Sequence, residues 1–302
     1  MANPFDRAIF LAVTVKVLGV SRKVDTDQVE VNTDKDLLRV SKKILACEEY
    51  DAIKKSVTEL KKFLKSRTVP GVKFVKGGIY PVPNSRLEEV DARVEAFKVT
   101  YGANVNLFLD VYETRKTQGI NRLADLGDEE DYPSLAKVRR SFGVDTRYIS
   151  IGPPASMQSV SREIFDRENE RLKSKFEEAA VQVQDAMRTM FADLLSHAAE
   201  RLQPGEDGKK KRFNATLVDN LKDFMDTFAD RNITGDADLE RLVNQMKMVL
   251  DGRDAEQIRK NSDIRALVTE QVADVKAKMD RMLSDRPSRS ITIDDAEDET
   301  NE

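Results

Sequence analysis

The sequence predicts an α+β protein that is mostly α. Long amphipathic helices are expected to pack as bundle-like or coiled-coil-like hairpins beside a small antiparallel sheet of two or three strands. One long stretch, residues 159–203, repeats apolar residues at steps of three and four, which is the period of a helix face. Two short stretches far apart in the chain, residues 13–17 and 145–151, alternate apolar and polar residues as half-buried strands do.

The helix expected over residues 159–203 is the element around which the other segments are organised. A helix of about 45 residues cannot bury an apolar stripe against itself, so other segments must lie along it. Glu168 interrupts the stripe, and strict heptads are missing from its first third. This favours burial within the chain over a coiled-coil dimer and leaves the oligomeric state open. The stripe consists of Val160, Ile164, Leu172, Phe176, Ala180, Val183, Met187, Met190, Phe191, Leu194, Ala198 and Leu202.

The two predicted strands lie too far apart in the chain to form a hairpin. The first belongs to residues 8–20, which are rich in β-branched side chains, and residues 21–34 indicate an extended connection after it. We expect this strand to pair with residues 145–151 across the domain, with helices inserted between them. Since two strands alone are marginally stable, the region around Tyr80 is a candidate third strand.

A first helix is expected over residues 35–65. Leu37 and Leu38 open its apolar stripe, and Asp34 or Thr33 is its expected N-cap. Lysines mark the outer face of this helix: Lys54, Lys55, Lys61 and Lys62.

A second helix is expected to begin at an N-cap of Asn84 or Ser85 and to reach residue 116. Ser85 and Glu88 have the spacing of a capping box at its start. Gly102 in its middle indicates a kink or a close helix crossing. A short helical piece follows around residues 121–126.

The rest of the chain is predicted to be helical apart from the second strand. A short helix capped by Ser134 is expected to end at Gly143. The last helical region is expected to open with a capping box of Asp254 and Gln257 and to break at residues 261–262. The helices expected beyond the long one cover residues 213–232, 236–250 and 254–283.

Composition divides the chain into three parts. Residues 1–152 form a mixed strand and helix half, and residues 153–286 form an all-helical half that continues from it as one unit. Residues 287–302 are mostly polar and acidic, which predicts a disordered tail.

The residue content also bears on the compartment. The single cysteine, Cys47, cannot form an intramolecular disulfide, which fits a reducing compartment, and its apolar neighbours indicate a buried core thiol. The most apolar run, residues 8–15, is shorter than the roughly 20 residues that span a bilayer, and no basic signal region precedes it. We therefore expect a cytoplasmic protein with no membrane contact.

Sequence motifs for catalysis or cofactor binding are absent. The chain has no Gly-Lys-Ser/Thr phosphate loop, no Gly-x-Gly-x-x-Gly, no Cys-x-x-Cys and no His-Glu-x-x-His. The only histidine, His197, lies at the flank of the long helix's stripe. Its candidate co-ligands one turn away are Asp193 and Glu200, a chance spacing that favours a flank or partly buried histidine over a metal site. The adjacent glycines Gly77 and Gly78 favour a turn over a phosphate-cradling loop, because no helix begins directly after them. We expect no enzyme activity, no cofactor and no metal.

Clusters of like charge are the other candidates for function. Glu48, Glu49 and Asp51, residues 128–131, and Glu168 with Glu170 are acidic groups in polar surroundings, which favours solvated faces over acid–base catalysis. Basic residues could contact an anion or a nucleic acid through the pair Arg139–Arg140 and through the loop residues Lys209, Lys210, Lys211 and Arg212.

Several segments together resemble domain-of-unknown-function family 3150, which is found in bacteria and their phages. The resemblance covers most of the chain except the acidic tail. It is carried by Asp34-x-x-Leu37-Leu38, Ser41-Lys42-Lys43, Tyr50-Asp51-Ala52-Ile53, Arg67-Thr68-Val69-Pro70, Lys76-Gly77-Gly78-Ile79-Tyr80-Pro81-Val82-Pro83, Tyr132-Pro133-Ser134, Val138 to Phe142, Arg212-Phe213-Asn214-Ala215-Thr216-Leu217-Val218-Asp219-Asn220-Leu221 and Asn232-Ile233-Thr234.

The resemblance implies a helical protein of phage or mobile-element origin. Genes of this family often lie near an AAA+ ATPase of the MoxR or cobaltochelatase-subunit type, which implies an accessory or substrate-side partner of such an ATPase. The resemblance transfers no active-site residues.

Three hypotheses of function follow. The favoured one is a non-enzymatic helical interaction or structural protein with a protein partner, in particular a MoxR-type AAA+ ATPase. The first alternative is a nucleic-acid-associated phage protein that uses the loop from Lys209 to Arg212. The second alternative is a metal-dependent enzyme centred on His197.

Overall fold

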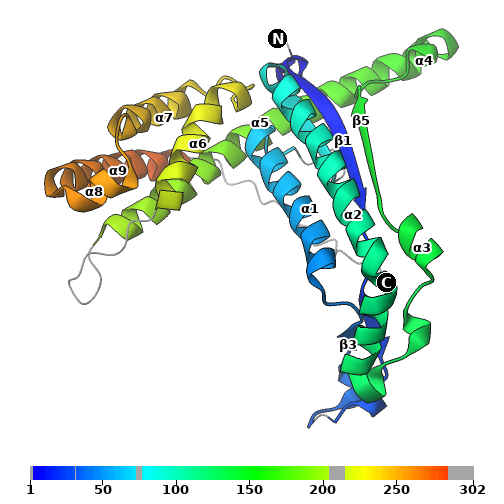
Figure 1. The fold of residues 1–302 in the computed structure, drawn as a ribbon. Helices are drawn as coiled ribbons and strands as arrows, with labels where there is room; N and C mark the ends of the chain where they lie inside the picture. Colours follow the sequence, from blue (N-terminus) through cyan, green and yellow to red (C-terminus); the bar gives the residue numbers. More distant parts are fainter. Residues whose placement is uncertain (1–2, 31, 73–76, 204–214, 285–302) are drawn as a thin grey trace. The chain divides into compact units, whose positions relative to one another are not determined.

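The computed structural model describes residues 3–30, 32–72, 77–203 and 215–284 (Figure 1). The described chain is α+β and mostly α, as the sequence predicts. It divides into two compact units. The first consists of Met1–Asp185 with Thr227–Gly235, and the second of Ala186–Asp226 with the chain from Asp236 onward. The boundary expected after residue 152 lies inside the first unit, and the tail over residues 287–302 lies outside the described residues.

The first unit is built on a three-stranded antiparallel sheet. Its strands are β1 (Ala8–Lys16), β4 (Ile79–Pro83) and β5 (Gly143–Ile149), in the order β4-β1-β5. Leu11 of β1 lies opposite Tyr80 of β4 and Tyr148 of β5, which fixes the register on both sides. The prediction that distant strands pair, with a third strand near Tyr80, is therefore confirmed.

A second, two-stranded sheet corrects two expectations for residues 21–47. The structure has β2 (Ser21–Val24) paired with β3 (Val40–Lys43), where we expected a connection and the first turns of a helix. Leu37 belongs to a short 3-10 helix (Lys35–Leu37) capped by Asp34, and its side chain is 83% exposed. An exposed leucine cannot anchor a helix stripe, and even the buried Ile44 and Leu45 precede the next helix, which begins at Glu48.

Two long helices cover one face of the three-stranded sheet. Helix α1 (Glu48–Arg67) and helix α2 (Leu87–Leu123) lie side by side (Figure 1). Buried aromatic rings join them, since the ring centroids of Tyr50 and Phe108 are 5.7 Å apart. The shared core also takes Leu11 and Val13 from β1.

Helix α2 differs from its prediction at three points. It runs seven residues beyond residue 116, to Leu123, so it includes the start of the short piece expected over residues 121–126. Ser85 lies in the 3-10 helix Asn84–Arg86 and makes no capping box, because its hydroxyl donates to Asp230 instead (2.6 Å). A Cβ on Gly102 would meet nothing within 4 Å, so this glycine does not mark a close helix crossing.

Short elements complete the first unit before its last helices. Helix α3 (Leu135–Arg140) begins after Ser134 as expected, although the Ser134 side chain makes no cap hydrogen bond, and Gly143 opens β5 instead of ending α3. The remaining short elements are 3-10 helices: Pro4–Arg7, Thr26–Gln28, Ala124–Leu126 and Glu129–Asp131.

The predicted long helix is one long helix preceded by a short one. Helix α4 (Ala155–Val160) ends at Ser161, whose φ of −154° and ψ of 108° are extended, and α5 (Arg162–Leu202) follows. Val160 and Ile164 were expected in the core but are 85% and 41% exposed. Ala179 and Leu195 are buried where Ala180 and Leu194 were expected, because the neighbouring elements select positions one residue away. The buried stripe is Phe176, Ala179, Val183, Met187, Phe191, Leu195, Ala198 and Leu202.

The second unit is a group of packed helices. Its core includes stacked rings of Phe191 and Phe224, with centroids 5.3 Å apart. Buried Arg265 donates to the carbonyl oxygens of Arg201 and Leu202 at the end of α5 (3.2 and 3.1 Å), where helix carbonyls lack partners of their own. Besides α5, its helices are α6 (Ala215–Arg231), α7 (Ala237–Leu250), α8 (Ala255–Lys260) and α9 (Ser262–Ser284).

Two local predictions for these helices are confirmed. The capping box of Asp254 and Gln257 is present, and the helix breaks at Asn261. Two methionines of α7 differ in burial. Met246 is buried, but Met248 is 71% exposed.

The two adjacent glycines before β4 give a matched test of this fold. Gly78 has a φ of +89°, and a Cβ there would lie 2.9 Å from the carbonyl oxygen of Val13, whereas a Cβ on Gly77 would meet nothing within 4 Å. Gly78→Ala should therefore lower the free energy of unfolding by about 1–3 kcal/mol. Gly77→Ala should leave it nearly unchanged. Urea unfolding of both variants measures the difference, and equal losses would contradict the turn geometry.

Candidate protein-interaction surface

Residues 155–175 in the first unit contain no buried residue, and they end the longest such stretch of the described chain, residues 139–175. We call residues 155–175, which form α4 and the start of α5, the uncovered segment. It nevertheless carries apolar side chains. Ile164 and Leu172 continue the line of the buried Phe176 along α5 at helical spacing, so the apolar stripe extends beyond the elements that cover it. The other apolar residues are Met157, Val160 and Phe165.

Aromatic packing fixes the end of the uncovered segment on the first unit. The ring of Phe176 lies 5.2 Å from that of Phe5, which in turn stacks on Phe10 of β1 at 6.0 Å. All three rings are buried, and Asn3 caps the short helix that holds Phe5. Phe176 is thus the first residue of the α5 stripe that is buried.

Local interactions hold the uncovered segment in a helical form. The hydroxyl of Ser161 accepts from the amide of Ile164 (3.4 Å) at the start of α5. Ion pairs one turn apart join Arg162 to Asp166 and Glu168 to Arg171, both at 3.8 Å. Such pairs contribute only about 0.2–0.5 kcal/mol each to helix stability. Packing of the apolar side chains against another surface would therefore stabilise this helix more than its own ion pairs do.

A basic face on α1 is the second candidate surface. Five exposed lysines lie within about three turns, and none has an ion pair with another described residue. At 100° per residue they share one side of the helix. These residues, here called the α1 lysine face, are Lys54, Lys55, Lys61, Lys62 and Lys65.

The basic residues singled out first from the sequence have different outcomes. Lys209, Lys210, Lys211 and Arg212 lie outside the described residues. Arg139 and Arg140 are exposed at the end of α3.

His197 is exposed on α5, beside a shallow hollow of about 310 Å³. The hollow is lined by Glu200, Arg201, Thr216, Leu217 and Asn220 together with the histidine. Within residues 3–30, 32–72, 77–203 and 215–284, no cluster of three or more His, Cys, Asp or Glu side chains could hold a metal ion. The described geometry gives the metal-enzyme hypothesis no support.

Cys47 differs from the expectation of a buried core thiol. It is half-buried at the N-cap position of α1 and makes no side-chain cap hydrogen bond. Burial raises the pKa of its thiol, and the nearby Glu49 adds to the effect. The thiol therefore stays protonated, which is the unreactive form.

The acidic groups act as ion-pair partners. Glu49 binds Arg115 through two hydrogen bonds (3.1 and 2.5 Å), which lower the pKa of its carboxyl. Asp131 lies 2.5 Å from the Lys42 ammonium. Every described carboxyl group with a clear pKa shift is shifted downward, the direction of a lasting anion and not of a proton donor.

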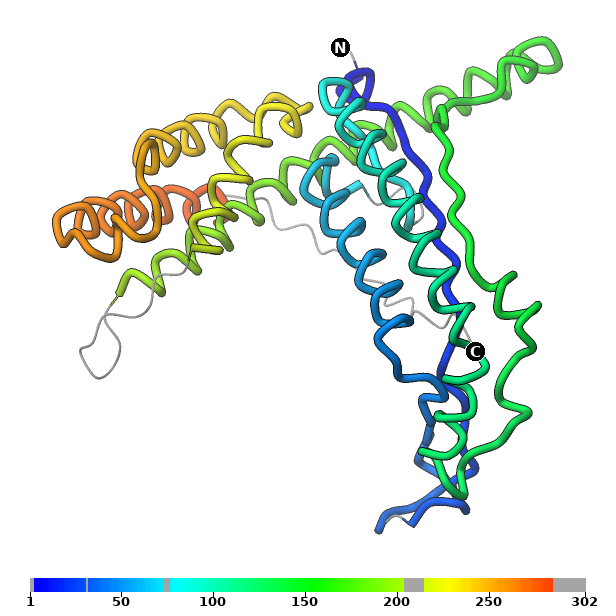
Figure 2. Tube along the Cα trace, in the orientation of Figure 1, coloured from blue at the N-terminus to red at the C-terminus, as the bar shows by residue number. Residues whose placement is uncertain are grey.

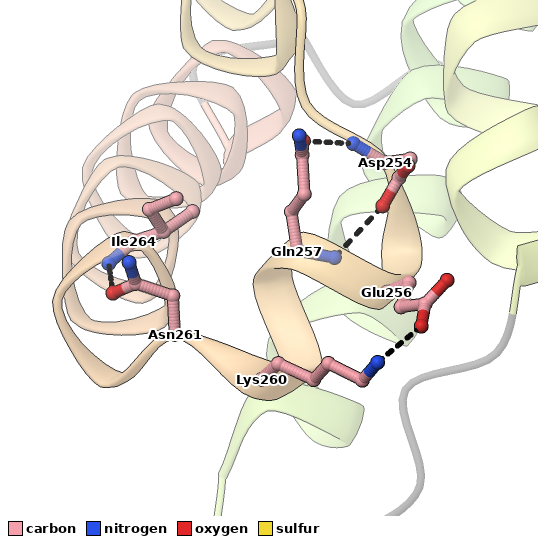
Figure 3. A pocket seen from close by; sticks show the side chains of 6 residues that line it. All are labelled: Asp254, Glu256, Gln257, Lys260, Asn261 and Ile264. Atoms are coloured by element: carbon pink, nitrogen blue, oxygen red, sulfur yellow. Dashed lines mark hydrogen bonds and ion pairs between the residues drawn. The ribbon is translucent and has the colours of Figure 1, made fainter.

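A hollow between α8 and α9 has its polar groups engaged in local structure (Figure 3). Asp254 and Gln257 bind each other's backbone amides in the capping box. Asn261 accepts from the amide of Ile264 (3.1 Å), and Glu256 pairs with Lys260 (2.5 Å). These contacts stabilise the turn between the helices.

Comparison of the chain with family models, curated proteins and solved structures gives no match. Among the described residues, no helix combines the length and the apolar character that crossing a membrane requires.

The uncovered segment was missed from the sequence, although a signal was present. The interruption at Glu168 and the missing heptads before it mark the same part of the helix that the structure leaves uncovered. The α1 lysine face was partly recognised, because four of its five lysines were placed on one helix face.

A polar network in the first unit yields a test by pH. Asp230 accepts from Ser85 (2.6 Å) and from Arg86 (2.7 Å). Burial alone would raise the pKa of Asp230, but these hydrogen bonds and the Arg86 charge outweigh it and lower the pKa below the ordinary 3.8. A lowered pKa in the folded state stabilises the protein above pH 3.8, and this stabilisation is lost as the pH falls through the lowered value.

Asp230→Asn should therefore lower the free energy of unfolding by about 1–3 kcal/mol at pH 7. The difference from the wild type should shrink in acid below pH 3.8. Urea unfolding across pH measures it, with Asp219→Asn, exposed on the same helix, as the control. A difference that stays constant down to pH 3 or so would contradict the assigned role of the charge.

Proposed function

We propose that this chain is a non-enzymatic helical interaction protein that binds a protein partner through the uncovered segment. One observation carries the proposal: an apolar helix stripe continues past the buried Phe176 through the half-buried Leu172 to Ile164, which is 41% exposed. Amphipathic helices of this kind bind by placing their apolar face in a groove of another protein. The ion pairs along the segment prepare the helix for binding, which reduces the entropy lost on association.

A MoxR-type AAA+ ATPase is the partner we propose, with the chain as an accessory or substrate-side protein of phage or mobile-element origin. Support for this partner comes from the resemblance to domain-of-unknown-function family 3150. Cytoplasmic location is part of the same proposal, since such ATPases act there.

Substitution of Ile164 tests the proposed surface. Ile164→Asp should lower recovery of the partner at least about tenfold in co-purification from native host lysate, because burial of an isoleucine contributes about 1.5–3 kcal/mol. Val181→Asp is the matched control, since Val181 is also exposed on α5 (51%) but points away from the stripe. Mass spectrometry identifies and quantifies the recovered proteins. Equal recovery with both variants, or a wild-type protein that emerges without an ATPase, would count against the proposal.

A second candidate function is nucleic-acid binding through the α1 lysine face. These lysines have no ion pair with a described residue, so they can contact the phosphates of a nucleic acid. Each contact releases a counterion from the phosphate backbone, which favours binding. This candidate extends the alternative that rested on the loop from Lys209 to Arg212.

Two lysine variants separate these sources of positive charge. Replacing Lys54, Lys61 and Lys65 with Ala should weaken a gel shift of duplex DNA and reduce the slope of log affinity against log salt by about 0.9 for each lost phosphate contact. Replacing Lys209, Lys210, Lys211 and Arg212 with Ala tests the loop by the same measurement. No gel shift by the wild type at low salt would remove this function for both surfaces.

A further inference from the structure

The two edge strands of the three-stranded sheet differ in whether their backbone can pair with another strand. Edge strand β4 contains Pro81 and Pro83, which lack an amide hydrogen, and the carbonyl of Pro81 already accepts from the amide of Val69 (2.9 Å). Edge strand β5 contains no proline. Besides its ladder with β1, its backbone has one described hydrogen bond, between Gly143 at its start and the hydroxyl of Tyr101, and residues 144–149 take no part in it. One edge is thus closed to further pairing, and the other is open.

Strand β5 is long enough to act as a pairing edge. It spans seven residues, all of them paired with β1 on the inner side, and lies at the margin of the sheet (Figures 1 and 2). In an antiparallel ladder every second residue of an edge strand directs its amide and carbonyl outward. Natural edge strands usually block this array with proline, a bulge or charged side chains; β5 has no proline and no bulge against β1, and its two charges, Asp145 and Arg147, are of opposite sign.

The side chains of β5 alternate between two distinct environments. Tyr148 donates its hydroxyl to Asp91 of α2 (2.6 Å), so Val144, Thr146 and Tyr148 face the helices. Asp145 and Arg147 lie on the opposite, open face, 57% and 73% exposed, and pair with each other at 2.8 Å. Because both side chains are exposed, this ion pair within the strand can be exchanged for pairs with a neighbouring strand.

We propose that β5 pairs with β5 of a second copy of this chain, antiparallel about a twofold axis at Thr146. In this register Asp145 lies opposite the partner's Arg147, and Arg147 lies opposite the partner's Asp145. Val144 lies opposite the partner's Tyr148, and Thr146 lies opposite the partner's Thr146. Opposite charges, aromatic with β-branched residues, and threonine pairs are each favourable cross-strand combinations.

The self-complementarity of β5 is what selects a second copy over an unrelated peptide. A twofold axis makes each favourable pair occur twice from one sequence, as an isologous interface requires. The pairing joins two three-stranded sheets into one of six strands, a common sheet size. It needs no contribution from the uncovered segment, so it is independent of the proposed function.

The mass of the wild-type protein in solution is the first test. Sedimentation equilibrium should show a dimer forming as concentration rises to about 100 µM. Hydrogen exchange of the β5 amides should slow over the same range. A protein that stays monomeric overturns the proposal, as does a dimer in which β5 exchanges at an unchanged rate.

Charge reversal tests the register. Asp145→Arg places two arginines opposite each other across the axis, and Arg147→Asp places two aspartates there, so each variant should dimerise at least about tenfold more weakly. The double variant Asp145→Arg/Arg147→Asp restores both opposite pairs and should dimerise as the wild type does. Both positions are exposed, so thermal unfolding should show each variant folded.

An equimolar mixture of the two single variants is the decisive measurement. Each alone carries like charges on β5, but a mixed dimer places arginines of one chain opposite aspartates of the other. Mixing should restore dimers to near the wild-type level. If the single variants dimerise normally, or if the mixture stays monomeric, the proposed pairing is wrong.

Discussion

Strand β1 has a hydrogen-bonded neighbour on each side, and both neighbours come from distant parts of the chain. Leu11 and Val13 on β1 are buried beneath α1 and α2, so the chain must return twice to complete the same sheet. Helix α1 lies in the chain between β1 and β4, and α2 lies between β4 and β5. The first unit can therefore form its core only when these distant strands are in register.

The same sheet explains why parts of the first unit remain uncovered. One face is covered by α1 and α2, whereas on the other face Phe5 and Phe176 cover the sheet around Phe10. N-terminal to Phe176 the apolar stripe of α5 contains no buried residue, and beyond β5 the sheet has no further described strand. The uncovered segment therefore has exposed apolar side chains, and the edge of β5 has unpaired backbone groups, so each can bind a further partner.

Periodicity was a reliable guide where one segment's pattern was strong. The strands around residues 13–17 and 145–151 and the capping box at Asp254 were predicted because short-range spacing alone specifies them. The third strand near Tyr80 was predicted for another reason, the marginal stability of two strands alone. Periodicity failed over residues 35–47, where Leu37 and Leu38 imitate the start of a helix stripe. The four-residue strands β2 and β3 are too short to show a clear alternation, so pairing between them, and not their own pattern, defines them.

The candidate surfaces divide in the same way. The sequence by itself determined that α5 is a helix with an apolar stripe, that α1 has a lysine-rich side and that β5 is a strand, because each property depends on residues within a few positions of one another. The tertiary structure alone decided that the stripe is covered only from Phe176 onward, that Ser85 binds Asp230 instead of capping its helix, and that β5 is an edge. These outcomes depend on which distant segment is nearby, and local spacing contains no information about that neighbour.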